Sequence, residues 1–333
     1  MIEEMVAKSL QPSVGTWTRH FILLFVTLLT STIAGVLYPF GSIPVLPDAD
    51  PQTFTEILAL ILSLPARYVA LIGTAVSAIV SDPLYLQQGL SFSLPLVFIL
   101  ISHEAGHYVA CRLYRVDATL PFFIPTPPML GPAGTFGAFI KIRSPLPSRR
   151  AIFDIGVAGP IAGFLALLPI AVIGVLRLRP APPEILVNAS GITFSDPLLL
   201  RLIGYFAGID PAASMGNPFY FAAWFGLLVT ALNLIPSGQL DGGHAVYAVF
   251  GEAIHRWTGR IAFITMVVLA MTGWIFFNSP SGFLLAILLG VMMKIRHPTP
   301  RDQEPLDAKR KAVAFLTLVI FLLCFLPFPI QIS

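Results

Sequence analysis

The sequence predicts an all-α polytopic membrane protein with about six to eight transmembrane segments. Of its 333 residues, 56% are hydrophobic and only 11% are charged, whereas soluble domains average about 45–50% apolar and 25% charged residues. Several apolar runs approach or exceed the roughly 20 residues that a helix needs to cross a bilayer. Between two of these runs, a proline- and glycine-rich stretch is predicted to form a membrane-associated β-like hairpin.

Charge and cysteine content exclude some classes of protein. The formal net charge of +3 is too small for this length to indicate a nucleic-acid partner. The apolar composition makes the lipid bilayer the expected environment. Cys111 and Cys324 lie in or beside apolar runs and are expected to be small buried side chains, not a disulfide framework. No cleavable signal peptide is expected, because the first apolar run begins near Phe21 and is long enough to span.

The apolar runs divide the chain into an ordered series of predicted spans. These are, in chain order, about 21–40, 92–111, 152–176, 216–236, 258–277, 281–295 and 312–330. The run at 281–295 is short for a full crossing. Residues 57–81 are apolar but contain Pro65 and Arg67. They are expected to form an interfacial or re-entrant element, although a kinked span is an alternative.

Basic residues predict the orientation. Lys and Arg cluster after the 92–111 run, between Arg112 and Arg150, and again after residue 293. Residues 41–56 and 180–200 carry neither. The positive-inside rule therefore places both clusters in the cytoplasm and the loop at 177–215 outside. The 92–111 and 216–236 runs then cross in the same direction and end at the same depth.

The stretch 120–147 cannot be a continuous helix, because it contains seven prolines and three glycines. Within it, apolar residues alternate from Phe136 to Arg143 in an imperfect strand pattern. Irregular backbone at membrane depth needs burial or a wet cavity. A substrate-docking role is therefore expected, with Gly137, Ala138 and Ile140 as candidates; an ordinary cytoplasmic loop is the alternative.

Two histidines and a glutamate inside the 92–111 run point to a metal site. His103, Glu104 and His107 form an H-E-x-x-H sequence, whose histidines share one face of a helix and suit two ligands of tetrahedral Zn²⁺. Glu104 is offset by about 100° and can reach a metal-bound water without becoming a ligand. Ionisable residues are costly in hydrocarbon, so their presence indicates function.

The third ligand is expected to be Asp241, which lies 134 residues after His107 and just beyond the 216–236 run. A fourth position would stay open for water, as catalytic zinc requires. Asn233, about two helical turns earlier, is a candidate donor to a substrate oxyanion or a helix–helix hydrogen bond. His244 is a candidate second-shell partner or surface residue. Asp154 is expected to be a helix N-terminal charge. The remaining histidines are expected to be solvated: His20, His255 and His297.

These residues resemble three motifs of the site-2 protease family of intramembrane zinc metalloproteases. The motifs are 103–107, 159–163 (Gly-Pro-Ile-Ala-Gly) and 233–242 (Asn-x-x-Pro-x-x-x-Leu-Asp-Gly), so the resemblance covers roughly residues 90–250. Residues 120–125 and 134–138 look more like the bacterial and chloroplast branch. The family resemblance implies a three-span core, zinc held by two His and one Asp, Glu as base, and cleavage near the cytoplasmic face. Two features depart from the family pattern: Leu234 stands where many members have proline, and no inserted PDZ-like domain is visible.

The sequence therefore predicts an intramembrane zinc metalloendopeptidase that cleaves single-pass membrane proteins. An N-terminal span with an external or interfacial segment (1–89) precedes a catalytic core (90–250) and C-terminal transmembrane segments (251–333). A multi-pass protein of the bacterial inner membrane is expected. A catalytically inactive metal-binding chaperone and a metal transporter are the alternatives. Intact Glu104 argues against the first, and the lack of paired broken helices or repeats argues against the second. The sequence does not indicate an oligomeric state.

Overall fold

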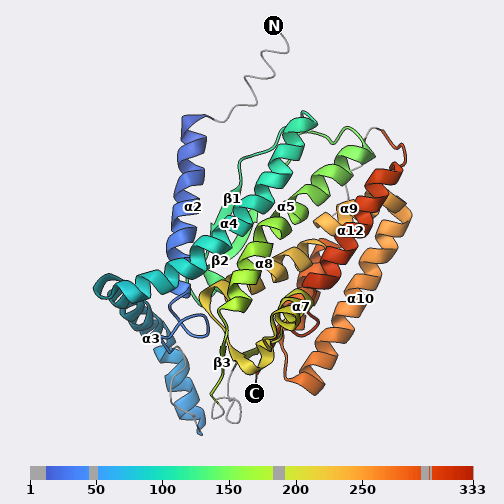
Figure 1. Ribbon diagram of the computed structural model, residues 1–333. Helices are drawn as coiled ribbons and strands as arrows, with labels where there is room; N and C mark the ends of the chain where they lie inside the picture. Colours follow the sequence, from blue (N-terminus) through green and yellow to red (C-terminus); the bar gives the residue numbers. More distant parts are fainter. Residues whose placement is uncertain (1–12, 45–51, 183–191, 294–299, 301, 333) are drawn as a thin grey trace.

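A computed structural model describes residues 13–44, 52–182, 192–293, 300 and 302–332, and His297 lies outside them. The chain is mostly helical (Figure 1). The helices are α2 (Val14–Ala34), α3 (Phe54–Ser81), α4 (Pro83–Leu113), α5 (Arg149–Leu176), α7 (Leu198–Ala207), α8 (Pro218–Asn233), α9 (Asp241–Phe250), α10 (Glu252–Phe277), α11 (Ser281–Met292) and α12 (Ala308–Cys324). The strands are β1 (Phe122–Pro125), β2 (Thr135–Phe139), β3 (Arg179–Pro180), β4 (Ile192–Phe194), β5 (Ser214–Met215) and β6 (Ile330–Ile332).

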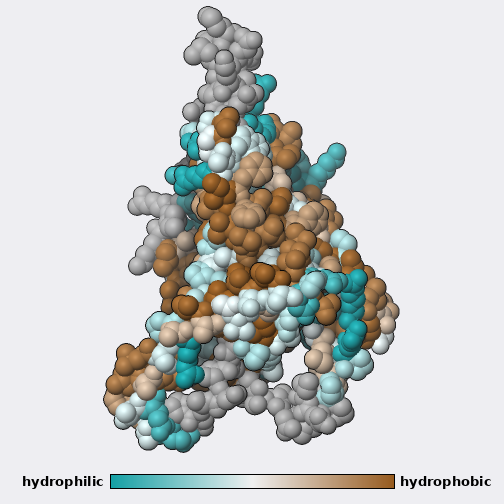
Figure 2. Space-filling view, turned by 90° about the vertical axis from the view of Figure 1, so that its left-hand side faces the viewer, coloured by the Kyte–Doolittle hydropathy of each residue, from teal (hydrophilic) through white to brown (hydrophobic). Residues whose placement is uncertain are grey.

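Five of the described helices are long and apolar enough to cross a bilayer: α2, α3, α4, α5 and α10. Helices α7, α8 and α11 are apolar but shorter. Apolar side chains cover much of the middle of the face shown in Figure 2, as expected for a surface in contact with lipid. The architecture is therefore that of a polytopic membrane protein, and the number of crossings stays a prediction.

Helices α4, α5 and α8 form the centre of the molecule. They approach closely because small residues line their contacts: a Cβ at Gly106 of α4 would lie 2.4 Å from the carbonyl oxygen of Ala158 in α5. Trp224 of α8 is fully buried in the same core, and its indole N–H donates to the carbonyl of Ser195. The glycine-rich start of α5 thus packs against α4, as its small-residue pattern predicts.

Helix α3 stands apart from this core and protrudes from the bundle in Figure 1. It is one continuous helix that includes Pro65, so the expectation of a re-entrant pair is wrong. Its second half packs against the end of α2, where Ala75 is buried beside Val36 and Leu37. The Tyr68 hydroxyl also donates to the Pro128 carbonyl at 3.0 Å. An interfacial position for α3 remains a prediction.

Strands β1 and β2 form an antiparallel pair that lies against α2. The Thr30 hydroxyl donates to the Gly134 carbonyl at 2.7 Å, and the ring of His20 bonds the Pro121 carbonyl at 2.7 Å. His20 is buried, so the expectation that it is solvated is wrong. Strand β2 ends earlier than the alternating sequence pattern, although the backbone N–H of Arg143 still donates to the Asp117 carbonyl.

The segment 177–215 contains structure that the sequence did not predict. Helix α7 begins after Pro197 and ends at Gly208, whose φ of +68° is the left-handed conformation that glycine adopts readily. Strand β4 pairs with β6 from the far end of the chain, and β3 pairs with β5. Short strands with distant partners leave almost no local signal, because the pairing supplies the stability.

The ends of α4, α5 and α12 meet at one end of the bundle, at the top of Figure 1. Arg310 of α12 pairs with Asp154 of α5 at 2.7 Å, and Tyr114 after α4 donates to the same carboxylate. Asp154 is therefore an ion-pair partner and not simply a helix N-terminal charge. Arg150 pairs with Glu304 nearby. Arg150 and Arg310, one from each basic cluster of the sequence, thus lie at the same end of the molecule.

Candidate metal centre

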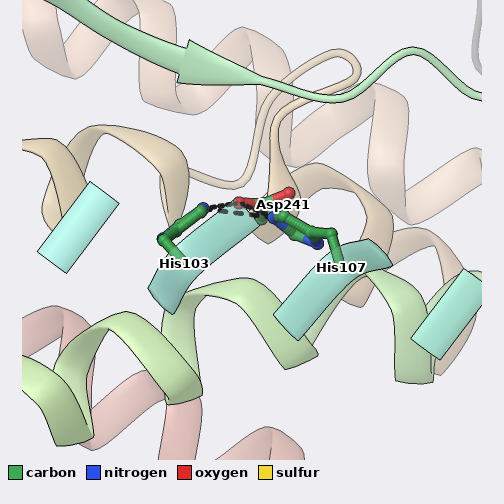
Figure 3. A group of neighbouring side chains, drawn as sticks. All are labelled: His103, His107 and Asp241. Atoms are coloured by element: carbon green, nitrogen blue, oxygen red, sulfur yellow. Dashed lines mark hydrogen bonds and ion pairs between the residues drawn. The ribbon is translucent and has the colours of Figure 1, made fainter. Parts of the chain in front are cut away.

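Helix α4 presents two imidazoles to the centre of the bundle. His103 and His107 are four residues apart and both are buried. Figure 3 shows their side chains converging from one face of α4 on Asp241. This follows from helix geometry, since residues four apart lie one above the other on the same side.

The segment between α8 and α9 brings Asp241 to the histidines. Helix α8 ends at Asn233, and Asp241 is the first residue of α9. The turn between them is tight: Gly238 has φ +55°, and a Cβ at Gly242 would lie 2.0 Å from the Leu234 carbonyl oxygen. The ring of His255 in α10 bonds the Gly238 carbonyl at 3.0 Å and so tethers this turn.

The three side chains have the spacing of a tetrahedral metal site. The Nε2 atoms of His103 and His107 are 3.1 Å apart, and each lies 3.3 Å from Oδ2 of Asp241. Zinc with ligands at about 2.0–2.1 Å sets ligand atoms about 3.3 Å from one another in tetrahedral geometry. The three atoms therefore have the spacing of one face of a zinc tetrahedron, and no fourth His, Cys, Asp or Glu among the described residues joins the group.

The hydrogen bonds around His107 also favour a cation here. Its Nδ1 lies 2.7 Å from the carbonyl oxygen of Ile155, which can only accept a hydrogen bond, so Nδ1 carries the proton. In the neutral ring, Nε2 then directs a lone pair at the Asp241 carboxylate and at His103 Nε2. Such an arrangement is repulsive without a positive charge between the atoms, and a carbonyl-bound Nδ1–H is the usual support of a metal-ligating histidine.

Glu104 lies next to these groups without joining them. It is buried and lines a cavity of about 580 Å³ together with His103, His107 and Asp241. Ile140, just after β2, lines the same cavity near the Glu104 carboxylate. Glu104 thus lies beside the cluster, at a position from which a carboxylate can exchange a proton with a water or a substrate in the cavity.

Asn233 and His244 line the same cavity. The Asn233 side-chain amide lies 3.2 Å from Nε2 of His103, so it reaches the cluster itself. Asn233 does not stand two helical turns before Asp241 on one helix, because α8 ends at Asn233 and a turn follows. His244 packs on α5, where a Cβ at Gly156 would lie 2.9 Å from His244 Cβ. It is adjacent to the cluster of three and not part of it.

Two of the candidate docking residues, Gly137 and Ala138, lie in β2, and Ile140 follows the strand. A strand passes above the cluster in Figure 3. Ala138 and Ile140 line the cavity. Gly137 precedes them with φ +94°, a conformation that favours glycine, and its N–H donates to the Thr135 hydroxyl. One edge of β2 pairs with β1; the other edge has no strand partner in the described part of the chain.

Sequence reasoning missed two residues that support the site. His255 was expected to be solvated, but it is buried and tethers the turn before Asp241. Its partner is a backbone carbonyl, which no sequence pattern reveals. Gly159 of α5 lies directly against His107: a Cβ there would be 2.1 Å from His107 Nε2. The small-residue pattern around Gly159 indicated close packing but not which side chain it receives.

Comparison with known protein families defines the class. The model of peptidase family M50, the family of the site-2 proteases, matches residues 91–273, more than half of the chain. This range contains both histidines, Glu104 and Asp241. The chain therefore belongs to peptidase family M50.

Individual relatives are named as probable zinc metalloproteases. The chain is 32% identical to "Probable zinc metalloprotease EGY1, chloroplastic" of Arabidopsis thaliana over 71% of this chain and 43% of that protein. It is 26% identical to EGY2 of the same plant over 73% of this chain and 43% of the relative. A rice EGY3 is 26% identical over 84% of this chain and 51% of the relative. The chain thus spans about half or less of the length of these curated relatives. Its relatives are named as zinc metalloproteases, and the chain groups with this chloroplast-type branch of the family.

Proposed function

We propose that this protein is an intramembrane zinc endopeptidase that hydrolyses peptide bonds of single-pass membrane proteins. The observation that carries the proposal is one buried cavity that holds three ligand atoms at tetrahedral spacing and a carboxylate beside them. We assign His103, His107 and Asp241 as the zinc ligands and Glu104 as the catalytic base. Family membership supports peptide hydrolysis, and the candidate membrane-spanning helices support substrates within the bilayer.

Each residue then has a defined role. Zinc, when bound, acts as a Lewis acid that polarises the scissile carbonyl and makes water a better nucleophile. Glu104 takes the proton from the attacking water and delivers it to the nitrogen of the leaving amine. The amide N–H of Asn233 points to the cluster and donates a hydrogen bond to the oxyanion as it forms. Ile155 fixes the His107 ring through Nδ1.

Two alternatives lose support. A metal-binding chaperone has no need for Glu104, which is buried next to the three candidate ligands at a cost in desolvation. A metal transporter needs a path through the protein and usually shows repeated halves. The match to a peptidase family favours hydrolysis over both.

For the orientation, we propose that the end of α4 that follows His107 faces the cytoplasm or the corresponding compartment. Arg150 and Arg310, which belong to the two basic clusters, lie at that end and form ion pairs there. Cleavage then occurs nearer that face. The relatives are chloroplastic, so a plastid membrane or its bacterial counterpart is the proposed location.

The ligand assignment predicts the metal content of three variants. Wild-type protein is expected to hold about one zinc per chain, and His103→Ala and Asp241→Ala are expected to hold almost none, because two ligands seldom retain zinc. Asp210→Ala, which changes an exposed aspartate that does not line the cavity, is the matched control and should keep its zinc. Elemental analysis of purified protein measures this. Cleavage of a single-span substrate in vesicles, lost on chelation and restored by zinc, tests the activity. Unchanged zinc in both ligand variants would refute the assignment.

The free edge of β2 suggests how a substrate is held. A peptide bond in a helix is shielded, so the substrate must be extended near the zinc, and an extended segment can pair with an exposed strand edge. We propose that residues 137–140 supply this edge, because Ala138 and Ile140 line the same cavity as the proposed base Glu104.

Proline on this edge is expected to slow cleavage. Ala138→Pro removes one backbone donor and should lower turnover about fivefold, since a hydrogen bond contributes about 1 kcal/mol. Ala138→Ser keeps the N–H and is the matched control. Zinc content should be unchanged in both, and helix-breaking residues in the substrate should partly restore the rate. Equal turnover in the two variants, or loss of zinc from the proline variant, would return this stretch to a structural loop.

A further inference from the structure

A second cavity lies on the outer side of α9, away from the zinc cluster. It is a groove of about 690 Å³ that is lined by α9, α10, α12 and the segment that follows α8. Its walls are apolar: Val246 and Phe250 of α9 face Phe315 and Leu318 of α12. Phe315 and Phe250 are 68% and 59% exposed, so the groove is open to its surroundings. In a membrane protein those surroundings are hydrocarbon chains.

One wall of this groove is formed by the segment that carries Asp241. Leu234 and Pro236 line the groove from the turn after α8, and Gly242 lines it immediately after Asp241. Ala245 of α9 completes this side. An occupant of the groove would therefore pack directly on the back of the turn that positions Asp241.

One cation marks an end of the groove. Lys311 is the only ionisable side chain among its lining residues, and it lies in the first turn of α12, where the chain leaves the polar segment 302–307. Lys311 is exposed and forms no ion pair within the described ranges. Arg149 lies close by, because its guanidinium donates to the Ala248 carbonyl, one residue before the groove residue Val249. The groove thus has an apolar body and a positively charged end.

We propose that this groove is a binding site for an anionic phospholipid. An acyl chain would lie between α9 and α12, and the phosphate-bearing headgroup would bind Lys311 at the membrane surface. The groove's charge complements such a lipid, because one Lys near the surface favours anionic over zwitterionic headgroups about fivefold. Bound lipid would brace the Asp241 turn from outside the site, so the proposal concerns a ligand distinct from the protease substrate.

Competition between two phospholipids with identical acyl chains tests the proposal. Purified protein is given equal amounts of phosphatidylglycerol and phosphatidylcholine, and native mass spectrometry counts the lipid that each chain retains. Wild-type protein should retain about one lipid and favour phosphatidylglycerol about fivefold. Lys311→Gln should abolish that preference. Lys309→Gln removes an equal charge from the same helix but not from the groove lining, and it should keep the preference.

A groove-filling variant tests the position of the acyl chain. Ala314→Phe fills the cavity and should lower retention of both lipids, and its thermal unfolding in phosphatidylcholine shows whether it is folded. If it is not, the lysine pair decides alone. Equal loss of preference in Lys311→Gln and Lys309→Gln would mean unspecific surface attraction and overturn the proposal. Full lipid retention by a folded Ala314→Phe would also overturn it. If that variant instead lost affinity for a single-span peptide, the groove would belong to a peptide helix.

Discussion

The Glu104→Gln variant is expected to bind zinc normally and to lose cleavage activity. Glutamine has almost the same shape as glutamate, so the cavity that Glu104 lines should keep its form. It cannot take a proton from water, however, and a positioned acid–base group contributes about 10²–10⁴-fold to the rate. Turnover should therefore fall at least a hundredfold while elemental analysis still finds about one zinc per chain.

A control separates this effect from any unrelated loss. Glu304→Gln makes the same chemical change at an exposed glutamate that pairs with Arg150, far from the cavity lining, and it should cleave at nearly the wild-type rate. Wild-type turnover by Glu104→Gln would show that another group is the base. Loss of zinc from that variant would instead place Glu104 among the ligands.

Replacing Gly159 by alanine is expected to remove zinc although no ligand residue is substituted. A Cβ at this position would lie 2.1 Å from His107 Nε2, the very atom that faces Asp241. No side chain tolerates such a contact, so His107 must rotate away or α4 and α5 must separate. Zinc content should fall to a small fraction of one per chain, and turnover should fall at least a hundredfold with it.

Elsewhere in a helix, replacing glycine by alanine has the opposite effect, because it normally stabilises the folded protein by about 0.5–1 kcal/mol. Gly73→Ala in α3 provides this comparison, because a Cβ there would meet nothing within 4 Å. Its zinc content and activity should match those of wild-type protein. A Gly159→Ala protein with full zinc would show that α5 can retreat from α4 without disturbing the site.

The parts of the fold that sequence could predict are those set by local chemistry. Apolar runs predicted α4, α5 and α10, because burial in lipid demands long apolar helices. They predicted where these helices end better than where they begin, since α4 begins at Pro83 and α10 at Glu252, well before the predicted runs at 92–111 and 258–277. The four-residue spacing of His103 and His107 predicted a shared face, and the direction of the runs predicted where Asp241 would arrive. Proline and glycine content predicted an irregular stretch before α5.

Long-range contacts account for what was missed. His20 and His255 were misjudged because their partners, Pro121 and Gly238, are backbone carbonyls on other elements. The pairing of β4 with β6 joins segments more than 130 residues apart, and neither strand exceeds three residues. Such contacts depend on how the helices assemble, and a single sequence carries no periodicity that reports it.

The unpaired edge of β2 also has a consequence for the enzyme between substrates. Backbone N–H and C=O groups cannot remain unsatisfied in hydrocarbon, so an open edge at this depth must meet water whenever no substrate strand covers it. The adjoining cavity of about 580 Å³ has room for on the order of 20 water molecules at about 30 Å³ each. Hydrolysis consumes one water for each bond cleaved. Without a bound substrate, the polar edge of β2 would therefore keep water in the site. Water is the second reactant of hydrolysis, so the edge would maintain its supply inside the membrane.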